Sequence, residues 1–189
     1  MLPCPLAGAQ SPSPRLRPAE RQGFFWDMSM LSELRSLLAG EPDPIANAAN
    51  TAAWLFLRLP RINWAGFYFL HGETLVVGPF QGQPACTRIP LGRGVCGTAA
   101  ARNETIVVPD VHLFEGHIAC DSASRSEIVV PFTIAGRLAG VLDIDSPELD
   151  RFKQPDRVLI EAVAALYAEA CASPAPADAG SRASQASPA

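Results

Sequence analysis

The sequence lacks the basic clusters and long apolar runs that mark a nucleic-acid surface or a membrane anchor. Its 15 Lys and Arg residues are scattered among 19 Asp and Glu residues, and the net charge is −4. Nucleic acids and anionic membranes attract concentrated positive charge, so we expect neither partner. No apolar run approaches the roughly 18 residues that a membrane-spanning helix needs. The first ten residues lack a basic start followed by a long apolar stretch, so we predict no secretory signal and a cytoplasmic protein.

The sequence also lacks closely paired cysteines. An odd number of scattered cysteines fits a reducing compartment better than a disulfide framework. No Cys-x-x-Cys pair occurs, and His112 and His117 are not at a familiar ligand spacing, so we expect no metal and no cofactor. The cysteines are Cys4, Cys86, Cys96, Cys120 and Cys171.

What remains is the composition of one globular domain. Hydrophobic residues make up 48% of the 189 residues and charged residues 18%, which is enough to build a sizeable core. Residues 1–23 and 173–189 are rich in Pro, Ala and Ser, so we predict a flexible extension and a disordered tail. The folded domain is expected over residues 24–172.

Within that domain the hydrophobic periodicity changes from helical to strand-like and back. Hairpin-type connections between the expected strands predict an α+β fold, with an antiparallel sheet and helices packed on one side. We expect helices near residues 28–38, 44–60, 92–102 and 154–171, and strands near 63–70, 75–80, 88–91, 105–108, 127–134 and 138–145.

The loop over residues 109–126 is long for a structureless connection in a compact domain. Loops of this length are usually functional, and this one contains His112, His117, Cys120, Asp121 and Arg125. We therefore expect it to contribute to a site.

Three cysteines, Cys86, Cys96 and Cys120, fall inside the folded domain. They could be small buried hydrophobic residues, but Cys86 and Cys120 stand among polar residues. A redox role needs a thiolate nucleophile and a second thiol within reach. The pattern leaves the nucleophile open, because the start of a helix would favour the thiolate of Cys96. Cys120 has His117 nearby in the sequence but is followed by Asp121.

Two acids lie on one face of the last expected strand. The strand period of two places Asp143 and Asp145 together, and Glu127 begins the neighbouring strand. They could be solvated acids at a sheet edge, or they could line a pocket that holds an ammonium group. In such a pocket crowding and burial raise carboxyl pKa values, so that one acid could donate a proton.

Aromatic residues follow the same alternation on the first expected strand. Trp64, Gly66 and Tyr68 share a face, and they form either ordinary core or a slot for a small methyl-bearing group.

Seven segments of the chain together carry a family resemblance: 63–68, 78–82, 92–98, 108–110, 116–121, 126–131 and 140–145. The most specific motif among them is Gly-His-Ile-Ala-Cys-Asp at residues 116–121. Together these segments resemble the free methionine-R-sulfoxide reductases, which use a GAF fold, and the resemblance extends over residues 24–172.

The resemblance implies roles for the thiols and the aromatic residues. Cys120 corresponds to the attacking cysteine, Cys86 to a resolving cysteine and Cys96 to a third redox cysteine. Trp64 and Tyr68 correspond to aromatic residues beside the methyl end of the substrate.

It also implies roles for the acids and the partners. Glu127, Asp143 and Asp145 correspond to acids that bind the amino group and assist the sulfoxide. Cys120 would become a sulfenic acid, Cys86 or else Cys96 would form a disulfide with it, and thioredoxin would reduce that disulfide. Members of the family often form homodimers. The rival interpretation, a sensory GAF domain that binds a small molecule without chemistry, leaves the three thiols without a purpose.

Overall fold

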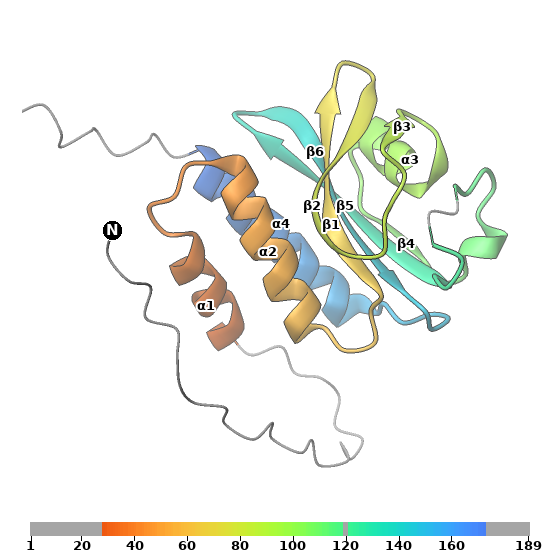
Figure 1. Ribbon diagram of the computed structural model, residues 1–189, viewed down its shortest axis with the longest axis horizontal. Coiled ribbons are helices and arrows are strands. Elements are labelled where there is room, and N and C mark those ends of the chain that lie inside the picture. The colour runs from red at the N-terminus through yellow and green to blue at the C-terminus, as the bar shows by residue number, and fades with distance from the viewer. Residues whose placement is uncertain (1–27, 119–120, 173–189) are drawn as a thin grey trace, which may run out of the picture.

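The computed structural model describes residues 28–118 and 121–172, for Met28 the backbone only. The predicted extension, which contains Cys4, and the predicted tail lie outside the described residues, and so does Cys120. Figure 1 shows the elements: α1 (Met28–Leu38), α2 (Pro44–Arg58), β1 (Trp64–His71), β2 (Thr74–Gly82), β3 (Arg88–Pro90), α3 (Gly94–Arg102), β4 (Ile106–Val108), η1 (Val111–Leu113), β5 (Ser126–Ile134), β6 (Arg137–Ser146) and α4 (Gln154–Ala172).

The strands form one six-stranded sheet in the order β3-β2-β1-β6-β5-β4. Every neighbouring pair is antiparallel, as the hairpin-type connections predict. The pairing of β1 with β6, which are far apart in sequence, brings Trp64 opposite Asp145 and Gly66 opposite Asp143. The central strands therefore place the sequence-predicted aromatic residues beside the sequence-predicted acids.

Local sequence signals set the start of α2. The Asp43 carboxylate accepts hydrogen bonds from the backbone N–H groups of Ile45 and Ala46, both at 2.8 Å. Pro44 occupies the first turn, where a missing N–H has no cost. α2 ends at Arg58, two residues before the predicted end at Pro60.

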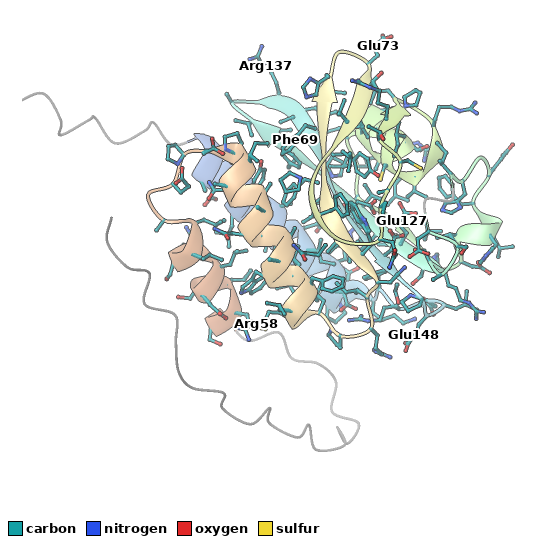
Figure 2. All side chains as sticks on the ribbon, in the orientation of Figure 1. Arg58, Phe69, Glu73, Glu127, Arg137 and Glu148 are labelled. Carbon is teal, nitrogen blue, oxygen red and sulfur yellow. The ribbon has the colours of Figure 1, made fainter. Side chains whose placement is uncertain are left out.

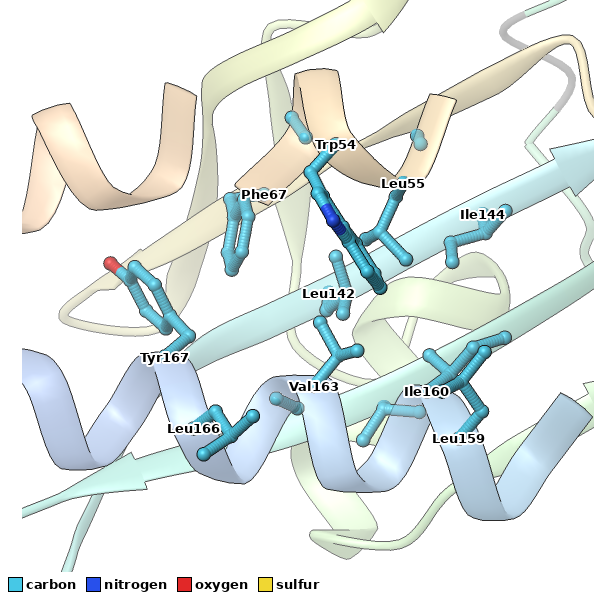
Figure 3. Packing of buried hydrophobic residues seen from close by; sticks show 14 of the residues in the cluster. Trp54, Leu55, Phe67, Leu142, Ile144, Leu159, Ile160, Val163, Leu166 and Tyr167 are labelled. Atoms are coloured by element: carbon cyan, nitrogen blue, oxygen red, sulfur yellow. The ribbon is translucent and has the colours of Figure 1, made fainter. Parts of the chain in front are cut away.

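The three longer helices, α1, α2 and α4, cover one face of the sheet, as predicted (Figure 1). Their apolar side chains enclose a core with Phe67 of β1, Leu142 and Ile144 of β6, and Tyr167 of α4, all fully buried (Figure 3). The shorter α3 lies on the opposite face. Its small side chains pack against the other side of the strands, and periodicity alone cannot tell which face a nine-residue helix covers.

None of the helices in the described part of the chain has the length and apolarity that a membrane-spanning segment needs.

Candidate active site

A pocket lies on the face of the sheet opposite α2 and α4, between α3, the loop after η1 and the strands β1, β5 and β6. Figure 2 shows Glu127 on this side of the sheet. The pocket combines aromatic, acidic and sulfur-bearing residues: its lining includes Trp64, Tyr68, Cys96, His117, Ile118, Asp121, Ser124, Glu127, Asp143 and Asp145.

The three acids lie together because neighbouring strands hold them in register. Glu127 of β5 pairs with Asp145 of β6, and Asp143 lies two residues before Asp145 on the same face. Only 5% of Glu127 and 6% of Asp143 is exposed, and Asp145 is half-buried. These exposures exclude the alternative of solvated acids at a sheet edge.

Burial makes these carboxyl groups unusually weak acids. It raises the pKa of Asp143 from 3.8 to about 7, an effect reduced by hydrogen bonds with Cys96 and Glu127. Burial and then the charges of Asp143 and Asp145 raise the pKa of Glu127 well above its ordinary range. The pKa of Asp145 is raised in the same way, by burial and then by Asp143 and Asp121. Near neutral pH the pocket therefore contains both carboxylate and protonated carboxyl groups.

Cys96 lies in the first turn of α3 and points toward the acids. Its Sγ is 3.8 Å from Glu127 Oε1, and its thiol is free and buried. The expectation that the helix start gives Cys96 thiolate character is wrong. Burial, and then the charges of Asp143 and Glu127, raise the pKa of the Cys96 thiol well above its ordinary value. Desolvation and two neighbouring acids outweigh the helix dipole.

The other two candidate thiols differ from Cys96. Cys86, half-buried in the loop between β2 and β3, is disulfide-bonded. Cys120 lies outside the described residues. Ile118 and Asp121, the nearest described residues on either side of it, both line the pocket.

A network that sequence reasoning missed anchors the loop after residue 120 to the sheet. Asn63, just before β1, donates hydrogen bonds to Asp121 Oδ2 at 2.9 Å and to Ser124 Oγ at 3.0 Å. The backbone N–H of Arg125 donates to Ser146 of β6 at 2.7 Å. The only available signal was that Asn63 opens the first segment of the resemblance, because short polar residues before a strand are otherwise uninformative.

The two histidines of the long loop differ in their placement. His117 lines the pocket, with Nε2 at 3.7 Å from Glu127 Oε2 and a side chain 17% exposed. Burial lowers the pKa of His117, and the charge of His112 lowers it further to a smaller extent. His112 is exposed and pairs with Asp110 at 2.8 Å instead.

The aromatic residues form a stack rather than an open slot at Gly66. The rings of Trp64 and Tyr68 are 5.9 Å apart, and Phe80, which sequence reasoning missed, stacks on Trp64 at 5.3 Å. A Cβ at Gly66 would lie 2.3 Å from Phe80 Cβ and 2.6 Å from Trp64 Cη2. Glycine there makes room for the Trp64 and Phe80 side chains, and Trp64 and Tyr68 form an apolar wall of the pocket beside the acids.

Comparison with known proteins shows similarity to a family of domains, to a named enzyme and to solved structures. Residues 41–171 match the GAF domain family. The free methionine-R-sulfoxide reductase of Escherichia coli is 55% identical over 133 residues, which are 70% of this chain and 79% of the relative. The structure of free methionine-R-sulfoxide reductase from Neisseria meningitidis in complex with its substrate is 46% identical, with a TM-score of 0.72, and covers 75% of this chain and 86% of that one. A structure proposed to be a GAF sensor protein, from Burkholderia vietnamiensis, is 58% identical, with a TM-score of 0.72, and covers 75% and 90%.

The match to the GAF domain over most of the chain and the identity to named reductases agree with the resemblance and with the fold. The chain belongs to the GAF domain family, within the free methionine-R-sulfoxide reductases.

Proposed function

We propose that this protein reduces free methionine-R-sulfoxide to methionine with a cysteine nucleophile. The observation that carries the proposal is the pocket itself, where three clustered acids, two of them buried, face an aromatic wall beside the loop that bears Cys120. A substrate with an ammonium group at one end and a methyl sulfoxide at the other matches this pocket, because the acids can bind the ammonium group and the aromatic wall can contact the methyl group.

The acids account for recognition of a free amino acid. An ammonium group that enters the pocket favours the ionised form of nearby carboxyls and forms charge-assisted hydrogen bonds with them. Asp143, with a pKa of about 7, needs the smallest perturbation to ionise and is the first candidate partner for the ammonium group. Trp64 and Tyr68 would then contact the methyl end.

The same acids account for the proton that the reaction consumes. The Cys120 thiolate attacks the sulfoxide sulfur, the sulfur–oxygen bond of the substrate breaks, and the protonated oxygen passes to Cys120 Sγ, so that Cys120 becomes a sulfenic acid and methionine leaves. The transferred oxygen needs a proton, and Glu127 or Asp145 can donate it because burial raises the pKa of both carboxyl groups and so favours their protonated forms. Sulfur of the substrate is reduced, and sulfur of Cys120 is oxidised.

A second thiol then closes the cycle, and Cys86 is the better candidate. Its thiol condenses with the sulfenic acid on Cys120, water leaves, and a disulfide forms for thioredoxin to reduce. The disulfide-bonded state of Cys86 supports this assignment, since Cys96 is free. Cys96, a free thiol buried beside Glu127, is the alternative resolving thiol.

The decisive assay is thioredoxin-coupled turnover on the separated epimers of free methionine sulfoxide. We expect consumption of the R epimer and little of the S epimer. Binding of the R epimer without consumption would favour the sensory alternative. Thioredoxin as reductant, a homodimer and a cytoplasmic location stay predictions, which the same assay, sedimentation and cell fractionation test in turn.

A further inference from the structure

One corner of the pocket brings together donors of the kinds that bind zinc. Cys96, Glu127 and Asp143 each offer one donor atom, and these atoms lie within 4.8 Å of one another. All three residues are buried, and they come from α3, β5 and β6. The sequence predicts no metal site because ligands from three elements leave no short spacing motif.

The separation of Cys96 and Glu127 is close to the one that a tetrahedral zinc ion requires. Zinc binds sulfur at about 2.3 Å and nitrogen or oxygen at about 2.0–2.2 Å, so ligand atoms in a tetrahedron lie about 3.3–3.6 Å apart. Cys96 Sγ is 3.8 Å from Glu127 Oε1, which is within a few tenths of an ångström of that range.

His117 is a candidate fourth donor of a different chemical kind, beside the three residues whose donor atoms lie mutually within 4.8 Å. Its Nε2 lies 3.7 Å from Glu127 Oε2, at the same carboxylate. One sulfur, one nitrogen and two oxygens form a mixed set that suits a borderline cation such as Zn²⁺ better than Mg²⁺ or Ca²⁺.

An unpartnered atom in this corner independently points to a ligand. Asp143 is 6% exposed, and its Oδ1 has no hydrogen-bond partner within the described residues. A buried polar atom without a partner destabilises the folded protein, and a bound cation would remove that cost. The substrate ammonium of the proposed function is one such cation, and a metal ion is another.

We propose that Cys96, His117, Glu127 and Asp143 bind a single Zn²⁺ ion, and that this ion excludes the substrate. The second half rests on the proposed function, because the ion occupies the place of the ammonium group. Free zinc would therefore be a reversible inhibitor that competes with methionine sulfoxide.

Zinc binding itself is tested without any turnover. The full-length oxidised protein, in which Cys86 is unable to ligate, is dialysed against buffered ZnCl₂, and bound metal is measured by atomic emission. We expect about one Zn²⁺ per chain, and an affinity weakened at least about tenfold in Cys96→Ser and in His117→Gln. The matched controls are Cys171→Ser, the other free thiol of the described residues, and His112→Gln, the exposed histidine.

Equal zinc binding by Cys96→Ser and Cys171→Ser, or by His117→Gln and His112→Gln, overturns the proposed site. His117→Gln keeps the test available if Cys96→Ser does not fold. Zinc bound as expected by a protein that does not reduce the sulfoxide would overturn the proposed function and leave the zinc site standing.

Competition is measured in the same dialysis. Free methionine should displace Zn²⁺ from the protein, whereas alanine, which chelates zinc through the same amino and carboxylate groups but lacks the thioether, should displace far less. Equal displacement by the two amino acids would show that zinc and the substrate do not share this corner.

Discussion

The two faces of the sheet are made by alternate residues of the same strands and differ in the groups that they bury. In β6, Leu142 and Ile144 are fully buried against α2 and α4. The residues that alternate with them, Asp143 and Asp145, face the pocket on the other side of the sheet. In β5, Ile128 lies on the helical face and its neighbour Glu127 on the pocket face. One face is an apolar core, and the other combines a second apolar cluster with groups whose charged forms are costly to bury.

The difference assigns separate tasks to the two faces. Burial of apolar area against the long helices stabilises the fold. The pocket face contains buried acids, a buried thiol and an unpartnered carboxylate oxygen, which are unfavourable for stability and useful for binding. Substitutions of adjacent residues should therefore have opposite effects, and the following changes test that contrast.

The largest effect on activity should come from Cys120→Ser. A serine hydroxyl supplies almost no anionic nucleophile at neutral pH, so turnover should fall by at least about a thousandfold. The circular dichroism spectrum and the melting temperature should stay those of the unmodified protein. Turnover near the original rate would remove Cys120 from the mechanism and make Cys96 the candidate nucleophile.

The largest effect on stability should come from Leu142→Ala on the helical face. Truncation leaves a cavity in the core beside its strand partner Phe67, and we expect a loss of about 2–5 kcal/mol in the free energy of unfolding. Urea denaturation gives the value. A loss below about 1 kcal/mol, the range of surface substitutions, would show that this face is not the dominant core.

Substitution of the adjacent residue, Asp143→Asn, should instead raise the free energy of unfolding at alkaline pH. The folded protein holds the Asp143 proton up to about pH 7, whereas the unfolded chain releases it near pH 3.8. Between these values the folded state binds more protons, so the free energy of unfolding falls as pH rises. Removing the ionisable group should therefore stabilise the protein above pH 7 by about 2–4 kcal/mol, and have little effect near pH 4.

Urea denaturation of Asp143→Asn at pH 5 and pH 8.5 checks this prediction. Asp150→Asn, which changes an exposed carboxylate on the protein surface, is the matched control. A stabilisation that does not grow with pH would mean that Asp143 is not a costly buried charge. KM for the sulfoxide should rise in the same variant, because an amide cannot offer a full negative charge to ammonium.

A smaller effect should come from Cys86→Ser. A single turnover should still release about one methionine per site, because Cys120 alone makes the first step. Recycling by thioredoxin should slow about tenfold, since the sulfenic acid lacks its partner thiol. Rapid-quench measurement separates the two phases, and unimpaired multiple turnover would indicate that Cys96 resolves or that no disulfide forms.

Alternation along the strands made much of this organisation predictable. Asp143 and Asp145 were placed on one face by the strand period, and the pairing of β1 with β6 confirms that they face the same side as Trp64 and Tyr68. Hairpin signals between β1 and β2 and between β5 and β6 predicted the antiparallel sheet. Such local patterns are readable because a strand exposes only two faces.

Features that depend on long-range packing could not be predicted. The depth of burial of Glu127, the proximity of Cys96 to it and the hydrogen bonds of Asn63 arise only when α3 and the long loop pack on the sheet. The Cys96 prediction failed for the same reason, because a helix start is visible in sequence and the surrounding desolvation is not. Of the two alternatives for the aromatic residues around Gly66, an open slot is excluded only by Phe80 of the neighbouring strand, which fills the space.

The central claim is that acids on the pocket face of the sheet bind the ammonium group of a free amino acid. The most direct test compares kcat/KM for free methionine-R-sulfoxide with that for its N-acetylated form, which has a neutral amide at the same position. The account predicts a loss of at least about tenfold in kcat/KM, from the loss of a charge-assisted hydrogen bond of about 1.5–3 kcal/mol. Equal kcat/KM values for the two compounds would contradict it, because the buried acids would then have no part in substrate recognition.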